Sequence, residues 1–165
     1  MGTESLITRD RLLALVRYDP DTGIFSRFMV SYGEWRILGC DNGAGYLCFT
    51  LDGRRYKAHR LAWLYMTGDW PPFDVDHVNM VKSDNRFANL RLATRSQNRA
   101  NTPRRADNTS GFKGVVRGRR AGTWAAQSMK DGKRVHLGTY DTPEAAHQAY
   151  CEAATILFDK FARMH

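Results

Sequence analysis

Four short polar strings between residues 75 and 98 contain the residue types needed for phosphodiester hydrolysis. They are Val75-Asp76-His77, Asp84-Asn85-Arg86, Asn89-Leu90-Arg91 and Gln97-Asn98. Hydrolysis of a phosphodiester needs an attacking water, relief of charge on the phosphate and stabilisation of the departing oxygen. An imidazole can deprotonate the water, and a divalent cation can supply the other two functions.

Asp76 and His77 are adjacent, so on a regular extended strand their side chains point to opposite faces. A bend at a strand end can instead aim Asp76 at a cation while His77 faces the water beside it. Asn98, on the helix expected to follow, can supply a second oxygen ligand. Because hard cations prefer oxygen ligands, the sequence predicts a Mg²⁺ site, with Mn²⁺ or another divalent cation as the alternative.

Basic charge is concentrated in the second half of the chain. The 165 residues hold 25 Lys and Arg against 17 Asp and Glu, a net charge of +8. Residues 1–76 have a net charge of −1, whereas residues 77–165 have a net charge of +9. Because basic residues that neutralise a phosphate backbone release its counterions, the second half is predicted to bind nucleic acid. A solvated basic face without a partner is the alternative.

The chain shows no signal for export or membrane insertion. No apolar run approaches the roughly 20 residues of a membrane span, and the polar start of the chain lacks the apolar stretch of a signal peptide. The three cysteines, Cys40, Cys48 and Cys151, form no Cys-x-x-Cys pair, and their odd number argues against a disulfide framework. We therefore expect a cytoplasmic protein, in the host cytoplasm if a phage encodes it.

Predicted helices and strands alternate over the first 101 residues. Thr8 and Thr94 are predicted N-caps, because a threonine oxygen can accept a hydrogen bond from an amide of the first helical turn. Asp52-Gly53 is the turn signal of a hairpin. Short helices are expected to begin at Thr8, to span 59–66 and to span 94–101. Strands are expected at 24–28, 46–51, 54–58, 73–77 and 90–92. His59 is interpreted as structural or DNA-facing.

A second pattern begins after residues 102–109, a polar segment that is predicted to be a linker. Three short strands are expected at 114–117, 124–129 and 134–138. Thr142 then caps a predicted helix that has Pro143 at its first position. Its predicted apolar face contains Ala145, Ala146, Ala149, Tyr150, Ala153 and Leu157. The small residues of this face would let the helix lie close to the sheet.

The strings around Asp76-His77 form one recognisable pattern with the run Asp84–Arg91 and with Gln97-Asn98. Residues 18–23 and 58–63 extend this pattern upstream. The pattern resembles the HNH endonucleases, particularly the phage homing type with a ββα-metal site. The similarity covers roughly residues 8 to 101 of the chain.

The resemblance assigns roles to four residues. It implies His77 as the general base that deprotonates water, and Asp76 and Asn98 as the metal ligands. It implies Asn89 as the residue that holds the loop behind His77. Met80 stands in that loop where family members often have glycine.

The tail of the chain contains a second recognisable pattern. Its runs are Gly114-Val115, Trp124–Ala126, Arg134–Thr142 and Glu144–Tyr150. They resemble the plant ethylene-response-factor DNA-binding domain, which lays a three-stranded antiparallel sheet, backed by one helix, into the major groove. The residues thereby implied to face DNA are Arg117, Arg119, Arg120, Trp124 and Arg134, with Lys113 and Lys133 suited to phosphate contacts. Core packing is the alternative for Trp124, and solvated charge is the alternative for the arginines. Relative to that family, Gln127 replaces an acid and His136 replaces a tryptophan.

We therefore predict an α+β protein of two domains. Residues 1–101 are predicted to form a ββα-metal HNH nuclease domain, residues 102–109 a linker, and residues 110–165 a three-stranded antiparallel sheet packed on one helix. The predicted function is metal-dependent nicking or cleavage of double-stranded DNA, as in phage homing. The rival interpretation is a non-catalytic, sequence-specific DNA-binding regulator. An RNA-directed nuclease and a restriction-like defence enzyme would share the same site.

Overall fold

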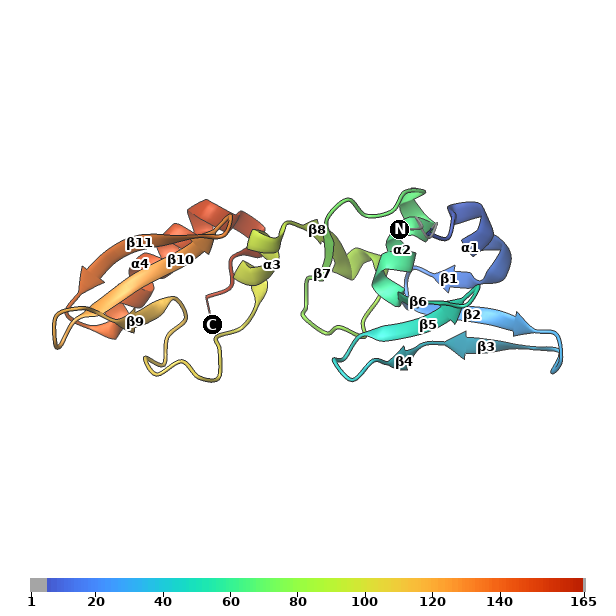
Figure 1. The fold of residues 1–165 in the computed structure, drawn as a ribbon, viewed down its shortest axis with the longest axis horizontal. Coiled ribbons are helices and arrows are strands. Elements are labelled where there is room, and N and C mark those ends of the chain that lie inside the picture. Colours follow the sequence, from blue (N-terminus) through green and yellow to red (C-terminus); the bar gives the residue numbers. More distant parts are fainter. Residues whose placement is uncertain (1–5, 165) are drawn as a thin grey trace. The chain divides into compact units, whose positions relative to one another are not determined.

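The structure is a computed structural model that describes residues 6–164. The chain divides into two compact units, the first ending at Leu92 and the second beginning at Ala93. Each unit mixes helices and strands (Figure 1), which confirms the predicted α+β class. Within the described part of the chain, no helix is long and apolar enough to cross a membrane.

The first unit is built mainly from short antiparallel strands. Its helices are α1 (Arg9–Leu15), α2 (Ala58–Thr67) and the 3₁₀ helix η1 (Phe87–Asn89). Its strands are β1 (Arg17–Asp19), β2 (Ile24–Met29), β3 (Glu34–Leu38), β4 (Cys40–Asp41), β5 (Leu47–Leu51), β6 (Arg54–Lys57), β7 (Asp74–His77) and β8 (Leu90–Ala93). They form the sheets β1-β2-β3, β4-β5-β6 and β7-β8.

Local chemistry explains where several of these elements begin and end. The Thr8 hydroxyl accepts a hydrogen bond from the Arg11 N–H and caps α1 as predicted. The predicted turn Asp52-Gly53 joins β5 to β6, with φ of 46° and 78°. α2 ends at Gly68, whose φ of 93° lies in the left-handed region that glycine adopts without strain.

The core of the first unit connects α2 to the strands that surround it. Leu12 of α1, Phe25 of β2, Leu51 of β5 and Leu61 of α2 are at most 1% exposed. Full burial of such side chains contributes roughly 1.5–3 kcal/mol each. Because β7 also packs against α2, this core fixes the strand that carries the candidate catalytic residues.

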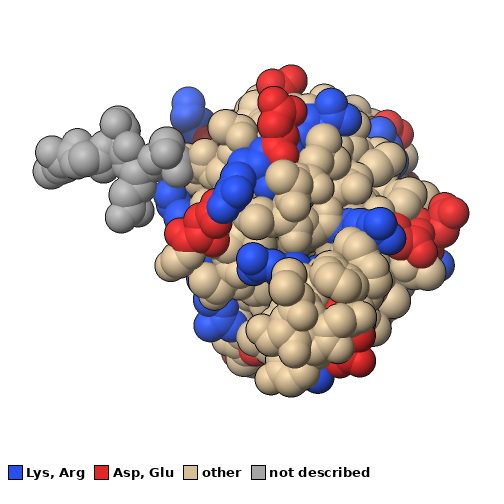
Figure 2. All heavy atoms as spheres, turned by 90° about the vertical axis from the view of Figure 1, so that its right-hand side faces the viewer, with Lys and Arg blue, Asp and Glu red and all other residues tan. Residues whose placement is uncertain are grey.

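The strand β3 is absent from the sequence prediction. It pairs with β2 in a hairpin that places Trp35 opposite Phe28. Both of these side chains are 44% exposed, and Ile37 is 74% exposed. Because β3 buries neither of its faces, no alternation of apolar and polar residues marks it as a strand. Figure 2 views the end of the first unit that carries this hairpin, where basic and acidic side chains are interspersed.

The second unit contains a three-stranded antiparallel sheet covered by one long helix. Its helices are α3 (Arg95–Asn101), α4 (Pro143–Phe158) and the 3₁₀ helix η2 (Asp159–Phe161). Its strands are β9 (Val115–Arg117), β10 (Trp124–Lys130) and β11 (Lys133–Tyr140), in the order β11-β10-β9. α4 packs along the sheet (Figure 1), as the sequence predicts.

The buried face of α4 differs from the predicted face by a small rotation. Its buried residues are Ala146, Tyr150, Ala154 and Phe158. Ala145, which is predicted to lie on this face, is exposed. The buried residues are four apart, so they form one line along the helix. The fully buried Ala146 and Ala154 let α4 approach the sheet closely.

α3 packs with the second unit. Thr94 forms a capping box with Gln97 at the start of this helix, which confirms the predicted cap. α3 contacts α4, β10 and η2, and Ala93 and Ala100 belong to the second hydrophobic core. The division between the compact units therefore lies before α3, because Ala93, just before this helix, and Ala100, within it, are buried with the second unit.

Candidate functional site

Asp76 and His77 end strand β7 and are both buried. Asp76 is 8% exposed and His77 is 3% exposed. The N–H of Val78 donates a hydrogen bond to the Asn89 carbonyl (2.9 Å), which keeps the chain after β7 close to the start of β8. The two residues therefore occupy a fixed position in a packed part of the first unit.

His77 is oriented by the amide of Asn85. His77 Nε2 lies 3.2 Å from Asn85 Oδ1, and Asn85 is only 1% exposed. Asn85 Nδ2 donates to the Ser83 carbonyl (3.4 Å), so its Oδ1 is the atom that faces the ring and accepts from Nε2–H. In the neutral imidazole, this assignment places the lone pair on Nδ1.

The surroundings of His77 favour its neutral form. Burial lowers the pKa of His77 below its usual value, and the Asn85 hydrogen bond and the charge of Asp76 oppose this effect in part. His77 is therefore neutral near pH 7, in the protonation state that accepts a proton from water.

Arg91 holds the carboxylate of Asp76. Arg91 Nε and Nη2 both lie 3.0 Å from Asp76 Oδ2. The side chains of Arg91 and Asp76 are 13% and 9% exposed, so this ion pair is screened little by solvent. The paired strands β7 and β8 bring the two residues together and fix the direction of the carboxylate.

Asn89 closes the loop that follows His77. Its Oδ1 accepts from the Asn79 N–H (3.0 Å), and its Nδ2 donates to Asn79 Oδ1 and to the Asp84 carbonyl, both at 2.9 Å. These contacts match the loop-holding role that the resemblance implies for Asn89. They are contacts to the loop and not to the His77 ring.

Met80 adopts a conformation typical of glycine. Its φ is 65°, in the left-handed region, and its N–H donates to the His77 carbonyl (3.0 Å). For a residue with a Cβ atom, this region costs roughly 1–2 kcal/mol. Met80 therefore holds a backbone conformation that glycine would adopt without this cost.

The turn around Pro20 supports the segment that presents Asn85. The Tyr18 hydroxyl donates to the Asn85 carbonyl (2.7 Å), and the Phe87 N–H donates to the Pro20 carbonyl (2.9 Å). A Cβ atom at Gly23 would collide with the backbone of Asn85, so this close approach requires glycine. A turn distant in sequence thus contributes to the position of the His77 ring.

The donor atoms at Asp76 fit a hard divalent cation. Within residues 6–164, no three His, Cys, Asp or Glu side chains gather as a possible metal site. Mg²⁺ usually takes one or two carboxylates and completes its shell with water and substrate phosphate oxygens, so a buried carboxylate beside an imidazole suits it. The second expected ligand, Asn98, lies half-exposed on α3, in the second unit. Its pairing with Asp76 stays a prediction.

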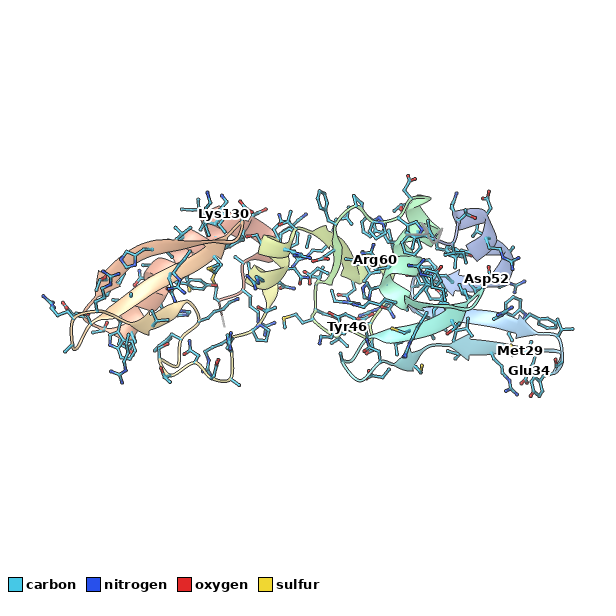
Figure 3. The ribbon with its side chains drawn as sticks, in the orientation of Figure 1. Met29, Glu34, Tyr46, Asp52, Arg60 and Lys130 are labelled. Carbon is cyan, nitrogen blue, oxygen red and sulfur yellow. The ribbon has the colours of Figure 1, made fainter. Side chains whose placement is uncertain are left out.

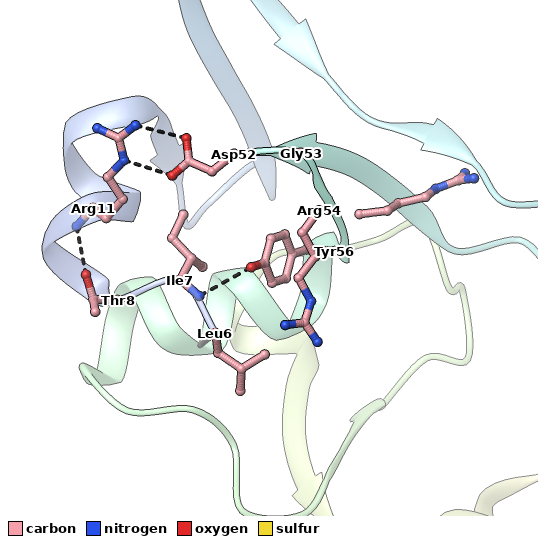
Figure 4. A pocket seen from close by; sticks show the side chains of 9 residues that line it. Leu6, Ile7, Thr8, Arg11, Asp52, Gly53, Arg54 and Tyr56 are labelled. Atoms are coloured by element: carbon pink, nitrogen blue, oxygen red, sulfur yellow. Dashed lines mark hydrogen bonds and ion pairs between the residues drawn. The ribbon is translucent and has the colours of Figure 1, made fainter. Parts of the chain in front are cut away.

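Another hollow in the first unit is separate from these residues. Its lining is Leu6, Ile7, Thr8, Arg11, Asp52, Gly53, Arg54, Arg55 and Tyr56. Figure 4 shows the two-point ion pair of Arg11 with Asp52 (2.8 and 2.9 Å) at its edge. Because neither Asp76 nor His77 lines it, this hollow is not the candidate catalytic site.

Arg134 lies on the face of the second unit's sheet that points away from α4. Ala126 and Ser128 are buried on the α4 side of β10, so the residues between and beside them point to the open face. Cross-strand pairing extends the open face to β11, where Arg134 lies opposite Met129 and His136 opposite Gln127. Arg134 is exposed and can contact a ligand from this face.

Trp124 and Arg117 lie on the α4 side of the sheet by the same alternation. They pair with each other and are two residues from the buried Ala126 and Val115. Trp124 is half-buried against the second core, and the Arg117 guanidinium lies 5.1 Å from the centre of its ring. The side chain of Trp124 thus contributes to the core and not to the open face.

The ammonium group of Lys113 is engaged within the second unit. Its Nζ donates to the carbonyls of Ala100 (2.6 Å), Thr102 (2.7 Å) and Arg163 (2.9 Å). Burial lowers the pKa of Lys113 to about 8. Three backbone carbonyls take up the donors that the sequence prediction assigned to phosphate.

The other predicted DNA-facing residues are exposed. Arg119, Arg120 and Lys133 lie at the surface, and Arg120 is 3.7 Å from the exposed Asp141. Surface ion pairs of this kind contribute little to stability, so they do not prevent a contact with another charged molecule.

Asn85 and Arg91 are site residues whose roles the sequence analysis missed. Both stand in the polar strings that indicate the site, so the sequence marks these residues without showing what they contact. Their partners, His77 and Asp76, are 8 and 15 residues away in sequence. No local pattern predicts those contacts, because they depend on the pairing of β7 with β8 and on the loop between them.

Comparisons with known proteins match both units. The family model described as HNH endonuclease matches residues 56–100, and the AP2 domain model matches residues 110–157. An uncharacterised HNH endonuclease of Acanthamoeba polyphaga mimivirus is 33% identical over 166 residues, covering 98% of this chain and 85% of the relative.

Fold, site and similarity together define a nuclease joined to a DNA-binding module. The chain belongs to the HNH endonuclease family. Both resemblances inferred from the sequence are thereby confirmed, and DNA is the partner that the two modules share. The alternative of a non-catalytic regulator is set aside, because family membership supports an enzyme.

Proposed function

We propose that the chain is a divalent-metal-dependent endonuclease that cleaves double-stranded DNA with His77 as its general base. The observation that carries this proposal is the hydrogen bond from His77 Nε2 to the buried Asn85 amide, which leaves Nδ1 as the basic nitrogen. A neutral, oriented imidazole is the group that the reaction needs for activating water.

The residues around His77 support each stage of the proton transfer. Nδ1 takes a proton from the attacking water, and the ring becomes an imidazolium. Nε2–H keeps its bond to Asn85 throughout, so the ring does not need to reorient. The adjacent Asp76 carboxylate stabilises the positive ring, and Arg91 keeps that carboxylate in place.

Asp76 and Asn98 are the residues proposed to hold the cation, with Mg²⁺ or Mn²⁺ as the expected ion. When bound, such a cation supplies positive charge that stabilises the phosphate and the departing oxygen. The proposal is supported by the oxygen chemistry of both side chains and by the resemblance to the ββα-metal site.

The second unit is proposed to bind duplex DNA and to raise the local concentration of substrate at the nuclease unit. Arg134 on the open face of the sheet supports this role, since arginine is the commonest side chain in base-specific contacts. The plasmid experiment at the end of this section distinguishes the two modes of cutting: nicking of one strand gives nicked circles, and cutting of both strands by two chains gives linear DNA.

Homing is the biological role proposed for this activity. The resemblance to phage homing nucleases supports it, and the mimivirus source of the relative accords with a mobile genetic element. The protein would then act in the cytoplasm of an infected host. Homing predicts one long recognition site per target genome, whereas a defence nuclease would cut at many sites, so mapping all cuts in a genome distinguishes them.

Supercoiled plasmid carrying the mapped site tests the proposal. We expect nicked or linear product with Mg²⁺ or Mn²⁺ and none with EDTA. The substitution His77→Ala should lower the rate by about 10²- to 10⁴-fold while leaving DNA affinity unchanged, because only the proton acceptor is removed. Cleavage by His77→Ala at the wild-type rate would show that another group is the base.

A further inference from the structure

Tyr46 forms one wall of the His77 site. This half-buried residue immediately precedes β5, and the centre of its ring lies 5.2 Å from the His59 ring and 6.1 Å from the His77 ring. Figure 3 shows Tyr46 beside the loop that follows β7. Burial raises the pKa of its hydroxyl, and the charges of Asp76 and Asp74 add to that effect.

Two lysines from different elements approach this one ring. Lys57 Nζ lies 4.6 Å and Lys82 Nζ lies 4.9 Å from the centre of the Tyr46 ring. Lys57 ends β6, and Lys82 belongs to the loop after β7, where its Nζ donates to the Ala44 carbonyl (2.9 Å). Both lysines are exposed to solvent.

The two ammonium groups repel each other. Because each lies within 5 Å of the same ring centre, they are closer together than the Debye length of about 10 Å at 0.1 M salt. Within residues 6–164, neither lysine forms an ion pair with a carboxylate. The cation–π contacts to Tyr46 hold both ammonium groups at the ring, and an anion bound beside them would offset their repulsion.

We propose that Lys57 and Lys82, held by the Tyr46 ring, bind a backbone phosphate of the DNA strand that is cut and so position that strand beside His77. This inference rests on the proposed function of His77. Lysine suits a phosphate of any sequence, because its ammonium acts as a point charge and not as a planar fork. We call Lys57, Lys82 and Tyr46 together the lysine clamp.

The lysine clamp complements the DNA-binding sheet of the second unit. Residues 1–92 hold 12 Lys and Arg against 11 Asp and Glu, a net charge of only +1, so the overall charge of the first unit gives little attraction to DNA. Lys57 and Lys82 concentrate positive charge next to the base instead. Their contribution is to local alignment of the strand, whereas the sheet supplies the main affinity.

The full-length chain tests the clamp with Lys57→Gln, Lys82→Gln and the double variant. Binding of a target duplex is measured in a His77→Ala background with EDTA present, so that the duplex stays uncut. We expect each glutamine variant to weaken binding by about tenfold at 0.1 M salt, and to reduce the slope of log affinity against log salt by about one. In the cutting-competent chain, the KM for DNA should rise by a similar factor.

Matched variants separate charge from structure. Lys57→Arg and Lys82→Arg keep the positive charge and should keep most of the affinity for DNA. Tyr46→Phe keeps the aromatic ring and should also keep most of it, whereas Tyr46→Leu removes the ring and should weaken binding. Lys160→Gln removes one positive charge from the second unit and should leave the KM unchanged. Thermal melting checks that every variant is folded. For the Lys82 variants it also shows whether the hydrogen bond to the Ala44 carbonyl is needed for folding.

The outcomes are separable from those of the proposed function. If both glutamine variants bind with the affinity and salt slope of the parent chain, the lysine clamp is wrong, whatever His77→Ala does to cleavage. If His77→Ala cleaves normally while the lysine variants bind weakly, the assignment of the base fails and the phosphate contact stands.

Discussion

The two units use their polar residues in opposite ways. Around His77, Asn85 and Asn89 are buried, with Asn85 hydrogen-bonded to the His77 ring and Asn89 to the loop that follows it, and Arg91 pairs with Asp76 away from solvent. On the sheet of the second unit, Arg134 is exposed and faces outward. A group that must accept a proton at one atom needs a fixed position, whereas a group that meets a solvated phosphate or base needs access.

After the loss of His77 itself, removing Asn85 is expected to have the largest effect. Asn85→Ala should lower the cleavage rate by about 10- to 100-fold, as for other residues that orient a reactive imidazole, because Nε2 loses the acceptor that sets the ring. Single-turnover cleavage at saturating protein measures this rate. Asn101→Ala, which truncates a buried asparagine of the second unit, should reduce stability without lowering the rate. Equal rate losses in both variants would point to unfolding as the cause.

Removing Arg134 should affect binding and leave the chemistry intact. Arg134→Ala should weaken DNA binding by about tenfold, since a good arginine contact to a base contributes roughly 1–3 kcal/mol. The cleavage rate at saturating DNA should not change. Arg117→Ala provides the control, because Arg117 lies on the α4 side of the sheet. A larger loss for Arg117→Ala than for Arg134→Ala would mean that the DNA-binding face is assigned to the wrong side.

Acid should destabilise the first unit through its buried histidines. Burial, with the nearby charges of His77, Lys57 and Arg60, lowers the pKa of His59 to about 3. The unfolded chain takes up a proton below about pH 6.5 that the folded chain refuses, so stability is complete above pH 6.5 and falls as the pH drops toward 3. His59 alone contributes at most about 1.4 kcal/mol per pH unit, and the lowered pKa of His77 acts in the same direction.

Urea unfolding at pH 7, 6 and 5 measures this dependence. His59→Phe should flatten the decline, whereas His136→Gln, at an exposed position of the second unit, should leave it unchanged. A decline of the same steepness in His59→Phe would place the acid-sensitive group elsewhere.

The smallest expected effect is a gain in stability at Met80. Met80→Gly should raise the unfolding free energy by about 0.5–1 kcal/mol, because relief of the left-handed backbone outweighs the greater freedom of glycine in the unfolded chain. Asp131→Gly, at a turn residue of the second unit with φ of 50°, should gain less, since aspartate tolerates this region better. Calorimetric melting compares the two, and a destabilised Met80→Gly would show that the methionine side chain stabilises the loop.

The sequence predicts elements well where short-range chemistry decides them. Thr8, Thr94 and Thr142 cap helices as expected, and the turn Asp52-Gly53 forms its hairpin. These features depend on a few neighbouring residues. The strand β3 was not predicted, because it is held by its hydrogen bonds to β2. It has no buried face that would leave an alternating pattern in the sequence.

The candidate site divides in the same way. The string that contains Asp76, His77 and Asn89 is visible in the sequence, and the contacts of Asn89 fit the role inferred for it. The bond of Asn85 to His77 and the pair of Arg91 with Asp76 join residues through the tertiary fold, so no local spacing predicts them. For Trp124 the sequence leaves DNA contact and core packing both open, and strand alternation turns the side chain toward the core.

The turn around Pro20 lies outside residues 56–100, the region shared with the family at large, and yet it braces the Asn85 segment. A fragment of residues 56–100 would retain Asp76, His77 and Asn98 and lose the turn that supports the Asn85 segment. A crossover between residues 23 and 56 would therefore separate the candidate catalytic residues from this support. The smallest fragment that keeps this support therefore begins near α1, upstream of residues 56–100.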